Sequence, residues 1–210
     1  MAPIERVSPL SAWSEHFATA SRAPDHFIIR EVPFATQISL RGNAAEAACA
    51  EAVRATLRLD LPDVANTWTA AGDCSALWLG PDEWLVVAAD GRQDELTGAL
   101  RAALQGVHHA VTDVSASRTA IEIAGADARL VLAKGCPLDL HGERFKPPQL
   151  AQTLLAKANL IIQCIDARPS FRLWVRNSFA SYVAHWLVDA ATENTASRSL
   201  DSDRIAARLA

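Results

Sequence analysis

The stretch Asp113–Leu140, DVSASRTAIEIAGADARLVLAKGCPLDL, carries the pattern on which the fold prediction rests. Its residues 119–124 alternate between polar and apolar, with Ile121 and Ile123 on one face, which is typical of a half-buried β-strand. Gly125 then allows a sharp turn, because glycine adopts backbone angles that other residues avoid. The stretch therefore predicts a strand that leads directly into a tight turn.

A short helix is expected after this turn. Asp127 puts a negative charge in the first helical turn, where the helix dipole favours it. Lys134-Gly135 and then Pro137 predict the end of the helix, because glycine and proline commonly follow helix C-termini. Three apolar residues are expected on the buried side of the helix: Leu130, Val131 and Ala133.

The same plan occurs earlier in the chain, which indicates an internal duplication. Four pairs of positions match at separations of 82 or 83 residues: Val32 with Val114, Ile38 with Ile121, Leu40 with Ile123, and Gly42 with Gly125. Residues 80–87, GPDEWLVV, match residues 167–175, ARPSFRLWV, at a separation of 88. Because the matches keep their order and each precedes a helical pattern, we expect an α+β fold of two similar α+β halves.

The duplication also predicts the domain organisation. One domain is expected over residues 27–191, with repeat one at about 27–106 and repeat two at about 107–191. Residues 1–26 are expected to form an N-terminal arm, and residues 192–210 a C-terminal tail that is solvated or docks on a neighbour.

The arm holds a few apolar residues among small polar ones. A short helix is possible over Ser11–Ala20. Trp13 and Phe17 have no evident place in the core, so the arm is a candidate for lying on a partner.

Periodicity and turn residues assign the elements of each half. Repeat one is expected to hold strands at Phe27–Ile29, Thr36–Gly42, Trp68, Leu77–Leu79 and Trp84–Ala89, a helix from the N-cap Asn43 to Leu57, and a helix at Gln93–Leu104. In repeat two, residues 150–162 also fit an amphipathic helix. Comparison with repeat one favours strands at Ala151–Ala156 and Leu160–Ile165 that turn at Lys157–Asn159, and a closing helix is expected at Ser178–Ala191.

Composition indicates a folded cytoplasmic protein. The chain has 210 residues, half of them hydrophobic, and a net charge of −4, which gives no reason to expect nucleic acid or an acidic membrane as partner. Charged residues interrupt any signal-peptide core near the N-terminus, and no apolar run is long enough to span a bilayer. The four cysteines are widely spaced without a CxxC motif, so reduced thiols are expected.

The common site motifs are missing from the sequence. No glycines follow the GxGxxG or GxxxxGK[ST] patterns that cradle dinucleotides and phosphates. His108 and His109 are adjacent, so on a strand they point to opposite faces and do not share a metal ion. His141-Gly142-Glu143 lies in a turn without a nearby third ligand.

Two further groups supply reactive residue types. Ser115 or Ser117 near Asp113 could belong to a triad with one of the histidines, but no GxSxG elbow sets such a geometry, and Asp113 is better explained as fixing the turn. Cys136 follows Lys134, but a helix end with Cys136 packed behind it explains both. We therefore assign no catalytic, cofactor-binding or metal-binding residue.

Four segments of the chain resemble the gamma subunit of heterotetrameric sarcosine oxidase. They are WLGPDEWLVV (78–87), the stretch 113–140, AQTLLAKANLII (151–162) and FRLWVRNSFASYVAHWLVDAA (171–191). The resemblance spans about Ile28–Ala191. It implies a fold like the folate-binding domain of the glycine-cleavage aminomethyltransferases, with two α+β halves interleaved through their first strands.

The resemblance also implies a function. It implies a non-catalytic gamma subunit of an αβγδ complex that oxidatively demethylates sarcosine to glycine, with hydrogen peroxide and formaldehyde or methylene-tetrahydrofolate as products. FAD, FMN, NAD, tetrahydrofolate and zinc lie on other subunits of such a complex, so no cofactor is expected in this chain. The implied partners are the alpha, beta and delta subunits, mainly the large folate-binding one.

The sequence departs from the wider aminomethyltransferase pattern. The acidic residue that those enzymes use on folate has no counterpart, because Arg176-Asn177-Ser178 follow the strand ending at Val175. Lys134-Gly135-Cys136 is similar to a signature of iron–sulfur-assembly relatives, but Pro137 follows it, and that function is not transferred. The alternatives are a stand-alone folate-binding or C1-transfer protein and, third, a metal- or thiol-dependent enzyme.

Overall fold

A computed structural model of the chain describes residues 5–22 and 25–192, and it contains two five-stranded antiparallel sheets. Sheet A has the order β1-β7-β10-β9-β8, and sheet B has the order β3-β4-β5-β2-β6. Their strands are β1 (Ile28–Val32), β2 (Thr36–Gly42), β3 (Trp68–Ala71), β4 (Cys74–Gly80), β5 (Glu83–Ala88), β6 (His109–Asp113), β7 (Arg118–Ala124), β8 (Leu150–Leu155), β9 (Ala158–Asp166) and β10 (Ser170–Arg176). The helical elements are η1 (Ser11–Trp13), α1 (Ser14–Ala20), α2 (Ala47–Leu57), α3 (Gln93–Ala103), α4 (Ala128–Ala133), η2 (Asn177–Phe179) and a C-terminal helix over residues 180–192.

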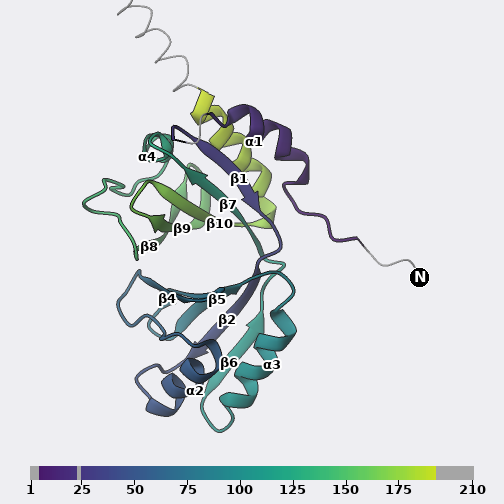
Figure 1. Cartoon of the computed structure of the whole chain (residues 1–210), viewed down its shortest axis with the longest axis vertical. Coiled ribbons are helices and arrows are strands. Elements are labelled where there is room, and N and C mark those ends of the chain that lie inside the picture. The colour runs from purple at the N-terminus through teal and green to yellow at the C-terminus, as the bar shows by residue number, and fades with distance from the viewer. Residues whose placement is uncertain (1–4, 23–24, 193–210) are drawn as a thin grey trace, which may run out of the picture.

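The two halves exchange their first strands. Strand β1 comes from the first half but pairs with β7 in sheet A, and β6 comes from the second half but pairs with β2 in sheet B. In Figure 1 the chain crosses from the upper to the lower sheet between β1 and β2. The expected α+β fold of two similar, interleaved halves is confirmed.

The strand register tests the matches between the halves. Ile38 pairs with Val86 and Leu40 with Trp84 in sheet B, as Ile121 pairs with Leu173 and Ile123 with Phe171 in sheet A. The strands β5 and β10 are therefore related by 87 residues, and the separation of 88 is wrong by one. A shift of one residue exchanges the two faces of a strand, so the match had joined side chains on opposite faces.

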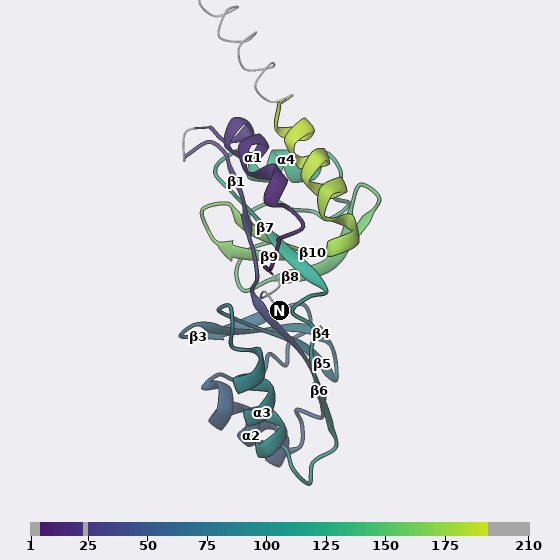
Figure 2. The ribbon, with the colours of Figure 1, turned by 90° about the vertical axis from the view of Figure 1, so that its right-hand side faces the viewer.

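The molecule has four layers, with helices outside and the two sheets facing each other inside (Figures 1 and 2). The helices α1, α4 and 180–192 cover sheet A, and α2 and α3 cover sheet B. A central core joins the sheets; its buried residues are Leu77, Leu85, Val87, Ala120, Leu150, Ile161 and Trp174. Each sheet is thus apolar on both faces, and the layered order buries both.

The N-terminal segment is not the free arm that its composition predicts. The expected helix forms, but Leu10 and Phe17 are only 2% and 4% exposed and belong to the core between sheet A and its helices. Trp13 packs against the same core. The physical reason is that β1 is an edge strand of sheet A, and α1 covers the apolar surface beside it. The tail beyond residue 192 lies outside the described residues.

Two local expectations were also wrong. Val131 is buried as expected, but its buried neighbours on α4 are Ala128 and Leu132, whereas Leu130 is 58% exposed and Ala133 is exposed. Asn43 does not cap α2; its Oδ1 accepts a hydrogen bond from Ala45 N at 3.1 Å, and the helix begins after Glu46. Asn43 therefore makes a turn one step before the helix.

The ambiguous segment of the second half is a hairpin. Strands β8 and β9 pair from Leu150↔Gln163 to Leu155↔Ala158, which confirms the two strands predicted from the repeat. The turn predicted at Lys157–Asn159 is wrong, because Ala158 and Asn159 already belong to β9 and the turn lies at residues 156–157. Their turn uses Ala156, whose φ is 52°.

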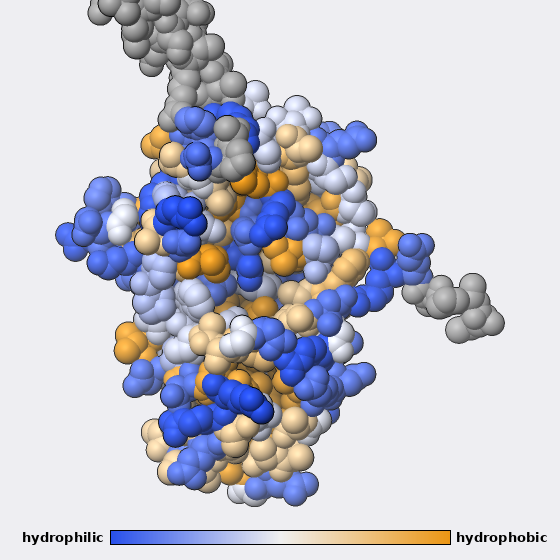
Figure 3. Space-filling view, viewed as in Figure 1, coloured by the Kyte–Doolittle hydropathy of each residue, from blue (hydrophilic) through white to orange (hydrophobic). Residues whose placement is uncertain are grey.

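On the face shown in Figure 3, hydrophobic side chains are scattered among hydrophilic ones and form no single large patch.

Candidate functional site

The polar residues of the stretch that predicts the fold form a turn. Asp113 ends β6, and its Oδ1 accepts hydrogen bonds from Ser115 N at 2.9 Å and Ser115 Oγ at 2.5 Å. Ser115 Oγ in turn accepts from Gln37 N at 3.0 Å, which ties the turn to β2. No histidine hydrogen-bonds to Asp113 or Ser115 within residues 5–22 and 25–192, so a triad does not form there, and the expected turn-fixing role of Asp113 is confirmed.

Lys134 and Cys136 lie where α4 ends, beside the C-terminal helix and the core of sheet A. Lys134 Nζ donates a hydrogen bond to Ala190 O at 2.6 Å, near the end of the C-terminal helix, where cations are favoured. Cys136 is buried in the core of sheet A. Gly135 lies so close to Trp186 that a Cβ there would be 2.5 Å from the indole ring. The expected helix end with Cys136 packed behind it is confirmed.

The histidines do not gather into a metal site. His109 Nδ1 lies 2.8 Å from Val107 O, and His108 is exposed. In the loop after α4, His141 N donates to Asp139 Oδ1 at 3.0 Å and Glu143 N donates to His141 Nδ1 at 3.3 Å, so these groups shape the loop. Within the part of the chain that the structure describes, no three His, Cys, Asp or Glu side chains could hold a metal ion.

The cysteines are poorly suited to nucleophilic catalysis. All four are free and buried. Burial raises the pKa of the Cys49, Cys74 and Cys164 thiols above the ordinary value, and nearby Asp73 adds to the rise at Cys74. A raised thiol pKa means that little thiolate, the reactive form, is present at neutral pH.

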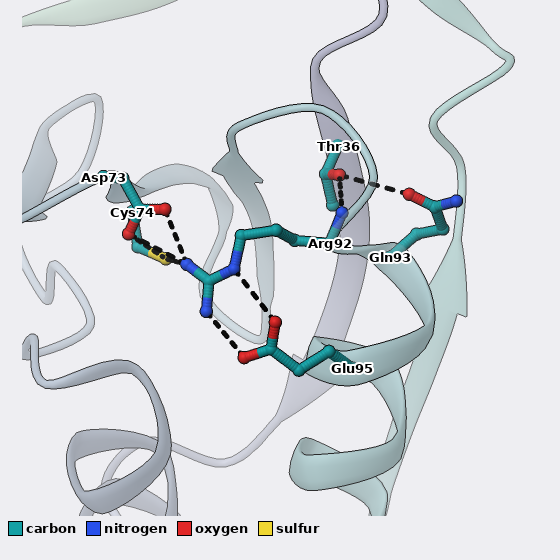
Figure 4. A network of polar contacts seen from close by, with 6 residues as sticks. All are labelled: Thr36, Asp73, Cys74, Arg92, Gln93 and Glu95. Atoms are coloured by element: carbon teal, nitrogen blue, oxygen red, sulfur yellow. Dashed lines mark hydrogen bonds and ion pairs between the residues drawn. The ribbon is translucent and has the colours of Figure 1, made fainter.

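The most extensive polar network lies on the first half and centres on Arg92 (Figure 4). Its guanidinium donates to Asp73 at 2.7 and 2.8 Å and to Glu95 at 2.7 and 3.1 Å. These hydrogen bonds lower the pKa of both carboxyl groups. Arg92 N also donates to Thr36 Oγ1 at 3.1 Å. Since every guanidinium nitrogen of Arg92 is engaged, the network clamps the β3–β4 turn to α3 and leaves no free guanidinium nitrogen for an anionic ligand.

A cavity of about 340 Å³ lies beside the Asp113 turn. The N-terminal segment contributes Arg6, which lies over the Phe34 ring at 4.4 Å and pairs with Asp90 at 2.8 Å. Asn177, on the opposite side, donates to Ala116 O at 2.8 Å. The polar groups of this cavity are largely satisfied by neighbouring residues.

A second cavity of about 470 Å³ opens at one end of sheet A and contains two arginines. Arg118 of β7 and Arg176 of β10 are direct cross-strand partners. The rest of the lining includes Gln152, Leu154, Asn159, Ile161 and Trp174. Burial, and then the positive charge of Arg176, lower the pKa of Arg118, although Glu83 acts in the opposite direction. Both arginines line this cavity, which makes it a candidate anion site. Arg118 also lines the first cavity, and its Nη1 donates a hydrogen bond to Ser117 Oγ at 3.3 Å.

Sequence reasoning missed this arginine pair. Both residues stand in the quoted segments, but 57 positions separate them, and only the register of β7 with β10 brings them together. Thr119 and Val175 are cross-strand partners one step further into the sheet, and no pattern in the sequence indicates this pairing.

No helix among the described residues is both long and apolar enough to cross a bilayer.

Comparison with known proteins gives consistent results. A profile of the sarcosine oxidase, gamma subunit family matches residues 41–193. The sarcosine oxidase subunit gamma of Arthrobacter sp. is 38% identical over 191 residues, which cover 90% of this chain and 91% of the relative.

Two solved structures extend the comparison. A chain of the heterotetrameric sarcosine oxidase from Corynebacterium sp. U-96, in complex with pyrrole 2-carboxylate, is 32% identical and superposes with a TM-score of 0.82, covering 90% of this chain and 95% of that one. The glycine cleavage system aminomethyltransferase T from Bartonella henselae shares the fold, with a TM-score of 0.60 at 18% identity over 86% of this chain and 49% of its own. The family profile and the close relative together show that this chain belongs to the sarcosine oxidase gamma subunit family.

Proposed function

We propose that this chain is a structural, non-catalytic gamma subunit of a heterotetrameric sarcosine oxidase. The observation that carries the proposal is the match to a chain of such an oxidase along nearly its whole length, with a TM-score of 0.82. The partners would be the alpha, beta and delta subunits of a cytoplasmic complex, mainly the large folate-binding subunit. Four unpaired cysteines are in keeping with a reducing compartment.

The placement of the reactive side chains supports a non-catalytic role. Asp113 and Ser115 are engaged in a turn, Lys134 binds a helix end, and the thiols of Cys49, Cys74 and Cys164 have raised pKa values. In the proposed complex, sarcosine is demethylated to glycine with hydrogen peroxide and formaldehyde or methylene-tetrahydrofolate as products. FAD, FMN, NAD, tetrahydrofolate and zinc would all lie on the other subunits.

Co-expression with the other three subunits tests the proposal. We expect this chain to elute with them at a fixed stoichiometry in size-exclusion chromatography with light scattering, and the complex to produce hydrogen peroxide from sarcosine. The isolated chain should produce none. Ser115→Ala and Cys136→Ser in the complex should keep the wild-type turnover. A chain that stays monomeric beside its co-expressed partners would contradict the proposal.

A titration of the isolated chain separates this role from stand-alone folate chemistry. A working folate site should bind tetrahydrofolate at micromolar concentrations and quench tryptophan fluorescence. We expect no heat of binding by calorimetry at about 100 µM, well above that range. Tight, saturable binding by the isolated chain would instead favour a folate-binding or C1-transfer protein.

A further inference from the structure

The arginine pair at the end of sheet A has no counter-ion of its own. Within residues 5–22 and 25–192, neither Arg118 nor Arg176 makes an ion pair with a carboxylate. Glu83, whose charge acts on Arg118, pairs instead with the guanidinium of Arg41 at 3.4 Å. Like charges placed directly opposite each other across two strands are unfavourable, so the sheet alone gains nothing from this arrangement.

Another arginine pair in the same sheet shows the usual solution. Arg30 and Arg172 flank Glu122 in register across β1, β7 and β10. Their guanidinium groups donate to its two carboxylate oxygens at 2.7 and 2.9 Å. A carboxylate between two arginines is therefore the arrangement that this sheet adopts where its own chain supplies the acid.

The first half shows that the fold does not require these arginines. Thr36↔Ala88 in sheet B corresponds to Thr119↔Val175 in sheet A. One step outward, the positions of Arg118 and Arg176 correspond to Ala35 and Ala89 of the first half. Small apolar residues satisfy the same place in the duplicated sheet, so the two charges serve a purpose that is specific to the second half.

We propose that Arg118 and Arg176 together receive a carboxylate side chain of a neighbouring subunit, an inference that rests on the proposed place of this chain in a complex. Two guanidinium forks on adjacent strands can hold both oxygens of one carboxylate. Asn159 and Gln152 line the same cavity, and the Gln152 amide nitrogen already donates one hydrogen bond, to Leu79 O at 2.8 Å.

A protein partner fits this end of the sheet better than a small anion. Three large apolar side chains nearby are exposed: Leu154 at 41%, Phe179 at 42% and Tyr182 at 40%. Leu154 lines the cavity, Phe179 lies three residues after Arg176, and Tyr182 Oη accepts a hydrogen bond from Lys157 N at 3.3 Å in the β8–β9 turn. Such apolar groups around a charged pocket are typical of a protein–protein interface.

Subunit exchange tests the inference in the assembled complex. Complexes carrying wild-type chain, Arg118→Gln/Arg176→Gln, or Arg168→Gln are mixed with excess labelled wild-type chain, and the rate of label uptake is measured. We expect the double variant to exchange about 10- to 100-fold faster at about 0.15 M salt, because loss of charge partners acts mainly on dissociation. At about 1 M salt the difference should shrink, since screening weakens the contact in the wild-type complex.

Arg168→Gln is the matched control. It makes the same Arg→Gln change once, at a side chain that is 93% exposed and does not line the cavity, so its exchange rate should equal that of the wild type. Circular dichroism should give the double variant a melting temperature no lower than that of the wild type, because it removes a repulsion.

Two results would overturn the inference. One is a double variant that exchanges at the wild-type rate in a complex that forms normally. The other is sub-millimolar binding of acetate to the isolated wild-type chain that the double variant loses, with subunit exchange unaffected; this points to a small carboxylate ligand. Failure of the wild-type chain to assemble would instead refute the proposed function.

Discussion

Replacing Gly125 by alanine should strongly destabilise the chain. Gly125 joins β7 to α4 with a φ of 106°, which L-residues rarely adopt. A Cβ at this position would lie 2.4 Å from the carbonyl oxygen of His26 and 2.8 Å from Phe27 N. The neighbours are backbone atoms next to β1, so they cannot turn away as a flexible side chain could.

The two costs can be estimated separately. An unfavourable positive φ costs about 1–2 kcal/mol in a non-glycine residue. Overpacking against a rigid neighbour costs roughly 1–3 kcal/mol more. The free energy of unfolding should therefore fall by about 2–5 kcal/mol, and at about 2–4 °C per kcal/mol for a chain of this size the melting temperature should fall by roughly 4–20 °C.

Thermal and urea unfolding of Gly125→Ala beside Gly72→Ala separates strain from overlap. Gly72 also has a positive φ, 60°, but nothing lies within 4 Å of its added Cβ, so only about 1 kcal/mol should be lost there. If both variants lose the same free energy, then the approach of residues 26 and 27 to Gly125 is not rigid. The reasoning about this turn would then be refuted.

Three further predictions concern stability and reactivity. Gly98 lies in the middle of α3 with open space around an added Cβ. Gly98→Ala should raise the free energy of unfolding by about 0.5–1 kcal/mol in urea titrations, because alanine is the better helix former. No gain in stability would contradict the assignment of Gly98 to a regular, solvent-facing helical position. Burial alone would raise the pKa of Glu122, but hydrogen bonds from Arg172 and Arg30 outweigh it and lower the pKa. The stabilisation from Glu122 is therefore full at neutral pH and is lost as the pH falls below the ordinary value of 4.5. Melting curves of Glu122→Gln should depend less on pH in that acid range than those of the wild type, and an unchanged dependence would contradict the assignment. The native chain should react slowly with a thiol-specific reagent at pH 7, since all four cysteines are buried, and four thiols per chain should react once it is unfolded. Fast reaction of one thiol in the native state would contradict this and identify an accessible, activated cysteine.

The sequence predicts the fold well where two signals agree. Residues 150–162 fit a helix or a hairpin by periodicity alone, and the correspondence with the first half selects the hairpin that β8 and β9 form. The match of Val32 with Val114 at 82 residues agrees with the observed register. Strand β1 pairs with β7 in sheet A as β6 pairs with β2 in sheet B, so β1 and β6 are equivalent strands of the two halves. Duplicated patterns carry long-range information that a single periodic segment lacks.

Prediction failed where burial depends on a distant partner. Phe17 lies in a short segment with few apolar residues, and it is buried only because α1 covers edge strand β1. Leu130 and Leu132 are equally apolar, yet the angle at which α4 docks on sheet A exposes the first and buries the second. The separation of 88 residues failed for another reason: most of β5 and residues 173–175 of β10 are apolar on both faces, because both faces of each sheet are covered. Such runs do not fix their own register.

The same argument explains why the candidate docking site was not visible in the sequence. Similarity between the two halves identifies residues that the fold requires, such as Thr36 and Thr119, which occupy equivalent positions in the two sheets. A function added to one half must instead appear as a difference between the halves. Arg118 and Arg176 are such a difference, but an alignment of β5 with β10 that is off by one residue hides it. With the register corrected, two arginines replace two alanines at one place on one sheet, where they repel each other unless an acid from outside residues 5–22 and 25–192 lies between them.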